Sequence, residues 1–344
     1  MPRTWPGWPP WLGRWGDEAR PGGLRPGPIL PGVPPMTFAV LFPGQGSQEP
    51  GMGADVFAAR PDLAATAAAV LGWDLERVCR EGPEEELTRT ERAQPALYAV
   101  SFALWEALAD RLARAPAGAA GHSLGEYTAL AAAGVFGFAE GLRLVAARGA
   151  AMGAAAAAAP SGMAALLGAE IEAAEALAGA RRAAGGSLWV ANVNAPGQVV
   201  VAGGLADLAW AEAHARENGV RRVARLKVAG AFHSPYMAPA AARLEAAMAG
   251  TAFHPPRFPV WANATATPHE NAPGALLLRQ LTAPVLFAAS LAAMADAGIR
   301  RFVHLGPGDV TAGLARRSVE GAETYVVSSL AEVDAVAAAL NASA

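Results

Sequence analysis

Cysteine is almost absent from this sequence. Of 344 residues only Cys79 is a cysteine, so the chain cannot form an internal disulfide, and a lone thiol is typical of a reducing compartment such as the cytoplasm. Long apolar runs are also lacking. Hydrophobic residues make up 53% of the chain, yet no stretch of about 18 or more strongly apolar residues occurs, which argues against a membrane-spanning helix.

Net charge is small as well. The formal charge is −3 at pH 7, which provides no general attraction to nucleic acid or to an anionic membrane. We therefore expect neither of them as a partner.

Residues 1–35 lack the features of a folded or an exported segment. They are rich in Pro, Gly, Trp and Arg, with no apolar core of a signal peptide and no helical or strand period, so we expect a disordered leader. The first strand-like run begins just after Met36. A further hypothesis is that Met36 is the true start and that the leader is not translated, which N-terminal mass spectrometry of the native protein would decide.

From Thr37 onward, strand-like runs alternate with helical stretches, which is typical of an α/β fold with a mainly parallel sheet. The predicted strands are 37–42, 188–193, 198–202, 223–228, 300–305 and 324–327. Residues 161–228 have their own pattern of strand, helix, strand, strand, helix, strand after Pro160. We therefore expect an inserted small subdomain at 161–228 and a larger α/β subdomain formed by 36–160 and 229–344.

A candidate nucleophile lies in the pentapeptide Gly121-His122-Ser123-Leu124-Gly125, which has the pattern G-x-S-x-G and precedes a helical run. In a nucleophile elbow, this pattern places the serine on a sharp turn between strand and helix. The same residues also suit an ordinary capped turn, and residues 115–120 are poor strand formers.

A glycine-loosened loop with the sequence PGQGSQ follows the first predicted strand at residues 43–48. It fits neither a dinucleotide fingerprint, because Glu49 stands where a third glycine or alanine is needed, nor a phosphate-binding P-loop, because it lacks Gly-Lys-Ser/Thr. Two interpretations remain: a plain turn, or a loop whose backbone N–H groups face a developing oxyanion.

Six histidines could supply a base, at positions 122, 214, 233, 254, 269 and 304. His233 follows a predicted strand and so lies on a loop, which suits a catalytic base and equally suits a surface residue. His304 lies inside a predicted strand, where a structural role is favoured.

Arg148 is unusual because it shares an apolar helical stripe with Leu144 and Met152. A core-facing guanidinium needs an anion. That anion is either a structural ion-pair partner or a substrate carboxylate held by two hydrogen bonds.

Six motifs in one order resemble the malonyl-CoA:acyl carrier protein transacylases, from about Thr37 to near the C-terminus. They are LFPGQGSQ at 41–48, GHSLGEY at 121–127, Arg148-Gly149 with Met152, NAPGQ at 194–198, GAFHS at 230–234 and GPG at 306–308. The resemblance implies an α/β-hydrolase-like larger subdomain with a parallel sheet, an inserted ferredoxin-like smaller subdomain, and an active site between the two.

The resemblance also implies residue roles. Ser123 would be the nucleophile and His233 its base, oriented by the backbone carbonyl of Gln280. The backbone N–H groups of Gln45 and Leu124 would form the oxyanion hole. Arg148 would hold the malonyl carboxylate, and Phe232 would crowd an α-methyl branch.

The implied reaction is a ping-pong transfer of malonyl from malonyl-CoA to acyl carrier protein through an ester on Ser123. Neither a metal nor another cofactor is expected. We expect a monomer. A free-standing chain with no fused domains favours fatty-acid biosynthesis, although a polyketide pathway stays open. Basic residues at 221, 222, 225 and 227, and at 316 and 317, are candidates for steering an acidic carrier protein, or form ordinary solvated faces.

Two rival functions are open at this stage. An α/β-hydrolase esterase would use Ser123, Asp296 and His304, in the order of that fold, but it leaves Arg148 without a role. An inactive carrier-binding scaffold would need none of these residues.

Overall fold

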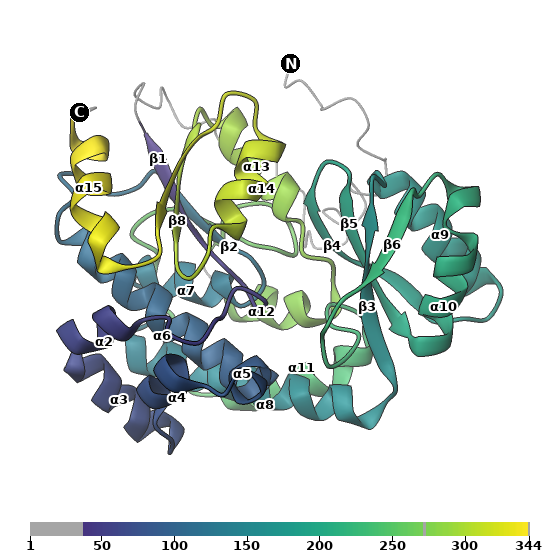
Figure 1. Ribbon diagram of the computed structural model, residues 1–344, viewed down its shortest axis with the longest axis horizontal. Helices are drawn as coiled ribbons and strands as arrows, with labels where there is room; N and C mark the ends of the chain where they lie inside the picture. The colour runs from purple at the N-terminus through teal and green to yellow at the C-terminus, as the bar shows by residue number, and fades with distance from the viewer. Residues whose placement is uncertain (1–36, 271–272, 343–344) are drawn as a thin grey trace.

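The computed structural model describes residues 37–270 and 273–342. Two sheets organise the chain, a parallel one in the larger part and an antiparallel one in the smaller part, side by side in Figure 1. The leader expected at residues 1–35 lies outside the described residues. Within the described ranges, no helix is both long and apolar enough to cross a membrane.

The larger part is built on a five-stranded sheet in which all neighbouring strands are parallel. In spatial order the strands are β7 (Val260–Trp261), β2 (Gly118–Gly121), β1 (Phe38–Phe42), β8 (Arg301–Leu305) and β9 (Glu323–Val327). The mainly parallel α/β fold predicted from the alternating pattern is confirmed.

The central strand β1 is buried on both faces, as expected when helices cover both sides of a parallel sheet. Its alternate residues divide between two cores, since side chains along a strand point to opposite faces. Val40 packs in the larger core with α6 (Thr90–Ala109), α7 (Gly125–Ala132) and α8 (Phe138–Ala158). Leu41 packs in the other core with α13 (Phe287–Asp296) and α14 (Val310–Ser318).

Further helices complete the larger part (Figure 1). They are α2 (Ala54–Ala59), α3 (Pro61–Leu71), α4 (Leu75–Glu81), α5 (Glu84–Thr88), α11 (Ala238–Met248), α12 (Pro273–Thr282) and α15 (Val333–Asn341), with 3-10 helices at Pro235–Met237 and Leu330–Glu332.

The smaller part has the order strand, helix, strand, strand, helix, strand and an antiparallel sheet β4-β5-β3-β6, which is a ferredoxin-like arrangement. Its elements are β3 (Ser161–Leu167), α9 (Ile171–Ala183), β4 (Leu188–Ala195), β5 (Gln198–Gly204), α10 (Leu205–His214), a 3-10 helix Arg216–Asn218 and β6 (Arg222–Arg225).

The small sheet uses its two faces differently. Ala164 and Leu166 of β3 join a core of their own with α9 and α10, whereas Met163 and Ala165 join the core of the larger part. The smaller part is therefore packed onto the larger one through the side chains on one face of β3.

Several element boundaries differ from expectation. The strand predicted at 223–228 is β6, which begins at Arg222 and ends at Arg225. Gly118–Gly121 forms a strand although Gly and Ala favour strands poorly. Its backbone pairs with β1 and β7 on either side, and the small residues fit there because a Cβ on Gly118 would lie 2.4 Å from the Trp261 ring.

Candidate active site

Ser123 lies on a sharp turn between β2 and α7, as the pentapeptide predicts. Its φ is +53°, a left-handed conformation that serine adopts rarely and that is typical of strained functional turns. The flanking glycines make the turn sterically feasible. A Cβ on Gly121 would lie 1.8 Å from the carbonyl carbon of Gly125, and one on Gly125 would lie 2.3 Å from the Phe42 carbonyl oxygen.

His233 contacts the serine from the loop after β6. Its Nε2 lies 2.8 Å from Ser123 Oγ, and its Nδ1 lies 2.8 Å from the backbone carbonyl oxygen of Gln280. A carbonyl can only accept, so Nδ1 carries the proton and Nε2 is free to accept the serine proton. The arrangement is a Ser-His dyad in which a carbonyl, not a carboxylate, holds the ring.

The imidazole of His233 is held neutral. Burial, the Arg148 guanidinium and His122 lower its pKa to about 3, against the opposing effect of the Gln280 carbonyl. A neutral imidazole is the form that can act as a base.

Arg148 is fully buried, with an exposed fraction of 0%, as its place in the apolar stripe predicts. Its Nη1 donates to Gln94 Oε1 at 2.7 Å, and its Nη2 donates to Gln280 Oε1 at 2.9 Å and to Ser123 Oγ at 3.0 Å. Its Nε has no partner, and no carboxylate in the described ranges pairs with it. Of the two interpretations open from the sequence, a structural ion pair is therefore not observed.

Gln45 and Leu124 flank the nucleophile. The loop carrying Gln45 packs directly on residue 122, where a Cβ on Gly44 would lie 2.5 Å from the His122 carbonyl oxygen. Leu124 is buried and caps the N-terminus of α7. The backbone N–H groups of Gln45 and Leu124 donate to no acceptor within residues 37–270 and 273–342. Phe232 is buried beside His233.

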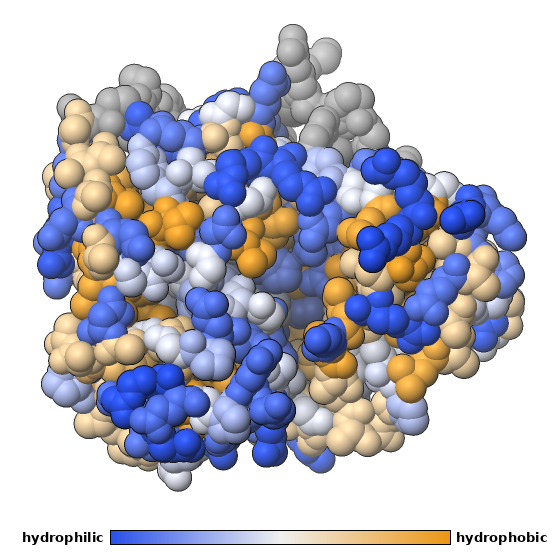
Figure 2. Space-filling model, viewed as in Figure 1, coloured by the Kyte–Doolittle hydropathy of each residue, from blue (hydrophilic) through white to orange (hydrophobic). Residues whose placement is uncertain are grey.

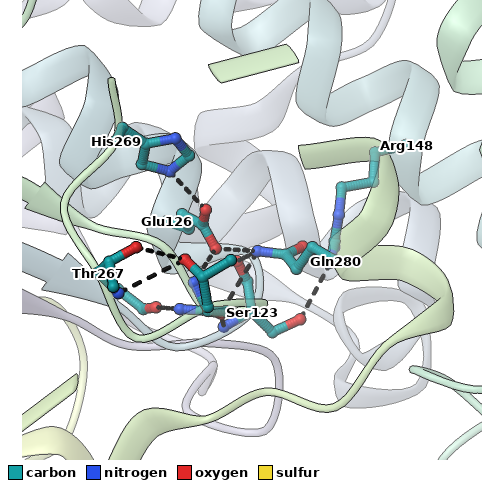
Figure 3. Close-up of polar contacts among 9 residues, drawn as sticks. Ser123, Glu126, Arg148, Thr267, His269 and Gln280 are labelled. Atoms are coloured by element: carbon teal, nitrogen blue, oxygen red, sulfur yellow. Dashed lines mark hydrogen bonds and ion pairs between the residues drawn. The ribbon is translucent and has the colours of Figure 1, made fainter. Parts of the chain in front are cut away.

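Four buried polar residues lie next to the dyad, to Arg148 or to one another, and no role was predicted for them except that His269 was one of six possible bases. They are Gln94, Glu126, Asn263 and His269. Asn263 accepts from the Ser123 N–H at 2.7 Å and donates to the Gly121 carbonyl at 2.7 Å, so it holds the elbow. Glu126 accepts from His269 Nε2 at 2.7 Å (Figure 3). Glu126 lies within the GHSLGEY motif, which was the one available signal for these residues.

The rival triad is not assembled. His304 is buried in β8, with Nδ1 2.6 Å from Thr311 Oγ1 and Nε2 3.0 Å from the Gly306 carbonyl oxygen. Ser123 instead contacts His233, so the structural role favoured for His304 is confirmed.

A cavity of about 430 Å³ adjoins Gln45, between residues 84–90 on one side and Lys227 to Ala229 on the other. Figure 2 shows the surface hollowed between the two parts of the molecule. Of the basic residues noted in the sequence, Lys227 lines this cavity. Arg225 pairs with Glu212 at 2.5 Å, and Arg316 and Arg317 bind Thr324 and Gln198.

Comparisons with known proteins give consistent matches. Residues 39–334 match the family described as acyl transferase domain. The malonyl CoA-acyl carrier protein transacylase of Escherichia coli K12 is 40% identical over 308 residues, covering 88% of this chain and 98% of that protein. The polyketide biosynthesis protein ThaF of Burkholderia thailandensis is also 40% identical, over 310 residues, but the match covers 88% of this chain and only 26% of that protein.

Solved structures agree. The malonyl-CoA:acyl carrier protein transacylase of Xanthomonas oryzae has a TM-score of 0.83 and 40% identity, over 88% of this chain and 98% of that one. A malonyl-transacylase in complex with its type II polyketide acyl carrier protein has a TM-score of 0.82 and 36% identity, over 87% of this chain and 98% of that one.

Proposed function

Since this chain belongs to the acyl transferase domain family, we propose that it moves malonyl from malonyl-CoA to the phosphopantetheine thiol of acyl carrier protein, through an ester on Ser123. One observation carries the choice of acyl group. The buried Arg148 guanidinium lies 3.0 Å from Ser123 Oγ and has only neutral hydrogen-bond partners. The Glu126 carboxylate acts on this guanidinium only through space, so an anionic acyl group on the serine would supply the directly bonded anion that Arg148 lacks.

In the first half-reaction, Ser123 Oγ attacks the thioester carbonyl and its proton passes to His233 Nε2. Negative charge develops on the carbonyl oxygen. The free N–H groups of Gln45 and Leu124, together with the N-terminal end of α7, stabilise that charge. When the carbon–sulfur bond breaks, the proton on His233 passes to the coenzyme A sulfur, and the malonyl-serine ester remains.

The second half-reaction reverses these roles. The carrier thiol gives its proton to His233 and its sulfur attacks the ester carbonyl. Ser123 Oγ then leaves and takes the proton back. Water competes with the thiol for the ester, so burial of His233 and Arg148 also protects the intermediate.

Arg148 selects the acyl group. A malonyl carboxylate accepts two charge-assisted hydrogen bonds from its planar guanidinium, whereas an acetyl group leaves the cation unpaired. Phe232, buried beside His233, narrows the space for an α-methyl branch.

The phosphopantetheine arm of the carrier protein enters through the cavity beside Gln45. Arg89 and Lys227 line this cavity together with Glu84 and Glu85, so the two basic residues are the groups there that would pair with an acidic partner. We further propose that residues 161–228 form a smaller subdomain that packs against the larger one, formed by 36–160 and 229–344, with the site between them.

The proposed compartment is the cytoplasm, supported by the single, buried thiol of Cys79.

Intact-protein mass spectrometry after mixing with malonyl-CoA tests the proposal. We expect one added malonyl group, which is removed when carrier protein carrying a free phosphopantetheine thiol is added. A protein that never gains this mass would instead support the rival function of an inactive carrier-binding scaffold.

Replacing Arg148 should change the choice of acyl group. We expect Arg148→Ala to lower malonyl loading roughly 30- to 1,000-fold, corresponding to about 2–4 kcal/mol, since a desolvated bidentate contact is lost. Acetyl loading should stay or rise, because acetyl has no carboxylate. Arg148→Lys keeps the positive charge but lacks the planar guanidinium that donates two hydrogen bonds, so it should restore malonyl loading only in part.

The measurement is the ratio of malonyl to acetyl adduct on Ser123 from equal concentrations of the two thioesters. An equal fall of both acyl groups in Arg148→Ala would make this arginine a purely structural residue.

The pH dependence should reflect the neutral His233. The base works only when unprotonated, so Ser123 reactivity is lost as pH falls through the pKa of His233. Because that pKa is lowered to about 3, we expect the loss well below the ordinary histidine value of about 6.5. The rate of labelling by a fluorophosphonate probe, which carries no titrating group in this range, measures it. A half-maximal rate near pH 6.5 would contradict the lowered pKa.

A further inference from the structure

A buried polar network lies directly behind the dyad, and the reaction as described does not use it. Glu126 and Asn263 are 0% exposed, and His269 is 6% exposed. They come from α7 and from the segment after β7. Glu126 and Asn263 contact the side chain of Gln280 on α12, and His269 contacts Glu126 from the other side (Figure 3). An unscreened carboxylate at this depth is costly unless its hydrogen bonds are satisfied, so its place next to the nucleophile calls for an explanation.

The carboxylate of Glu126 is fully engaged. Its Oε1 accepts from His269 Nε2 at 2.7 Å, and its Oε2 accepts from the Asn263 N–H at 3.0 Å and from Gln280 Nε2 at 2.5 Å. Glu126 therefore presents only acceptors to the amide of Gln280.

This carboxylate determines which way the Gln280 amide faces. Gln280 Nε2 is surrounded by oxygen acceptors: Glu126 Oε2, the Ser123 carbonyl at 2.9 Å and Asn263 Oδ1 at 3.3 Å. A flipped amide would set its oxygen against all three and its NH₂ against a guanidinium. In the observed orientation both ends of the Gln280 amide form hydrogen bonds, and Oε1 faces Arg148.

Gln280 Oε1 is in turn one of the acceptors that hold Arg148, at 2.9 Å from Nη2. The guanidinium approaches Ser123 Oγ through the same nitrogen. Gln280 thus serves the site twice, since its backbone carbonyl orients His233 and its side chain orients Arg148.

We propose that Glu126 is a positioning residue for acyl selection: through the Gln280 amide it fixes Arg148 at the distance from Ser123 where a malonyl carboxylate is gripped. This inference rests on the proposed malonyl transfer. Glu126 hydrogen-bonds to neither the Ser123 hydroxyl nor Arg148, and it reaches them through Gln280 and Asn263. An effect through Gln280 falls on the choice of acyl group, whereas an effect through Asn263, which holds the Ser123 turn, falls on both acyl groups equally.

Three substitutions at two positions separate the network from the dyad. Gln280→Met has a similar shape and keeps the backbone carbonyl that holds His233, but removes both ends of the amide. Glu126→Met removes the acceptor for Gln280 Nε2. Glu126→Gln removes the charge and replaces one of the two acceptor oxygens by a donor NH₂, so an acceptor remains for Gln280 Nε2 when the new NH₂ faces His269. As a matched control, Leu177→Ala makes a cavity in the core of the small sheet, far along the chain from the network.

The readout is the ratio of malonyl to acetyl adduct on Ser123, with folding followed by thermal unfolding. We expect the ratio to fall roughly 10- to 100-fold in Gln280→Met and Glu126→Met, the range for a misplaced binding group, and less in Glu126→Gln. Leu177→Ala should lower the unfolding temperature and leave the ratio unchanged.

The inference is overturned if Gln280→Met keeps the wild-type ratio, or if the Glu126 variants lose malonyl and acetyl loading equally. Gln280→Met by itself tests whether the Gln280 side chain positions Arg148. The inference can therefore be overturned even if a Glu126 variant fails to fold. A wild-type protein that takes up no malonyl would instead refute the proposed function, so the two failures are distinguishable.

Discussion

Ser123→Ala is expected to give a folded protein that never acquires the malonyl adduct. The substitution removes only the hydroxyl, which contacts His233 Nε2 and Arg148 Nη2 in the wild type. Arg148 keeps its bonds to Gln94 and Gln280, and alanine meets the same backbone strain at φ +53° as serine does. We expect the free energy of unfolding to change by less than about 1 kcal/mol.

A second serine provides the control. Ser290 is fully buried and donates its hydroxyl to the Leu286 carbonyl at 3.2 Å, on α13 and away from the dyad. Ser290→Ala should acquire the malonyl adduct as the wild type does. A full adduct on Ser123→Ala, detected by intact mass, would place the nucleophile elsewhere.

The sharp turn that carries Ser123 was predictable because its signal is local. Glycines two residues before and after Ser123 are required by contacts within the turn and with β1, so the pentapeptide carries the geometry with it. The strand before it was not predictable from propensity. Gly118–Gly121 pairs on both sides with other strands, and this pairing outweighs the weak preference of Gly and Ala for strands.

The surroundings of Arg148 were only half predictable. The helical period places the side chain in the core, and the structure agrees. The helical period does not indicate which groups of other helices and strands face the Arg148 side chain. Besides Ser123 Oγ, its acceptors are two neutral amides from α6 and α12, 54 positions before it and 132 after it in the chain.

The only sequence signal for the network around Glu126 was the place of Glu126 in the GHSLGEY motif, which does not indicate its partners. A glutamate in the first turn of a helix is most simply explained by the helix dipole, and a histidine after a short strand by solvent exposure. Their buried contact joins residues 143 positions apart. Such contacts follow from the folded topology, which brings α7, α12 and the segment after β7 together.

The His233 substitution separates the dyad from the rival triad. We expect His233→Ala to slow acylation of Ser123 by roughly 10²–10⁴, the usual contribution of a general base. The residual rate comes from the oxyanion donors and from Arg148, neither of which the substitution touches. The measurement is single-turnover acylation by malonyl-CoA, followed by intact mass.

Two further variants identify the cause of that loss. His233 has a φ of +55°, which asparagine tolerates better than alanine, so His233→Asn removes the base with less backbone strain. Equal slowing in the Ala and Asn variants assigns the effect to the missing base. His304→Ala should acylate within a few-fold of wild type, because His304 contacts Thr311 and Gly306 and does not contact the nucleophile. If His304→Ala lost acylation while His233→Ala kept it, the serine would be served by the esterase triad.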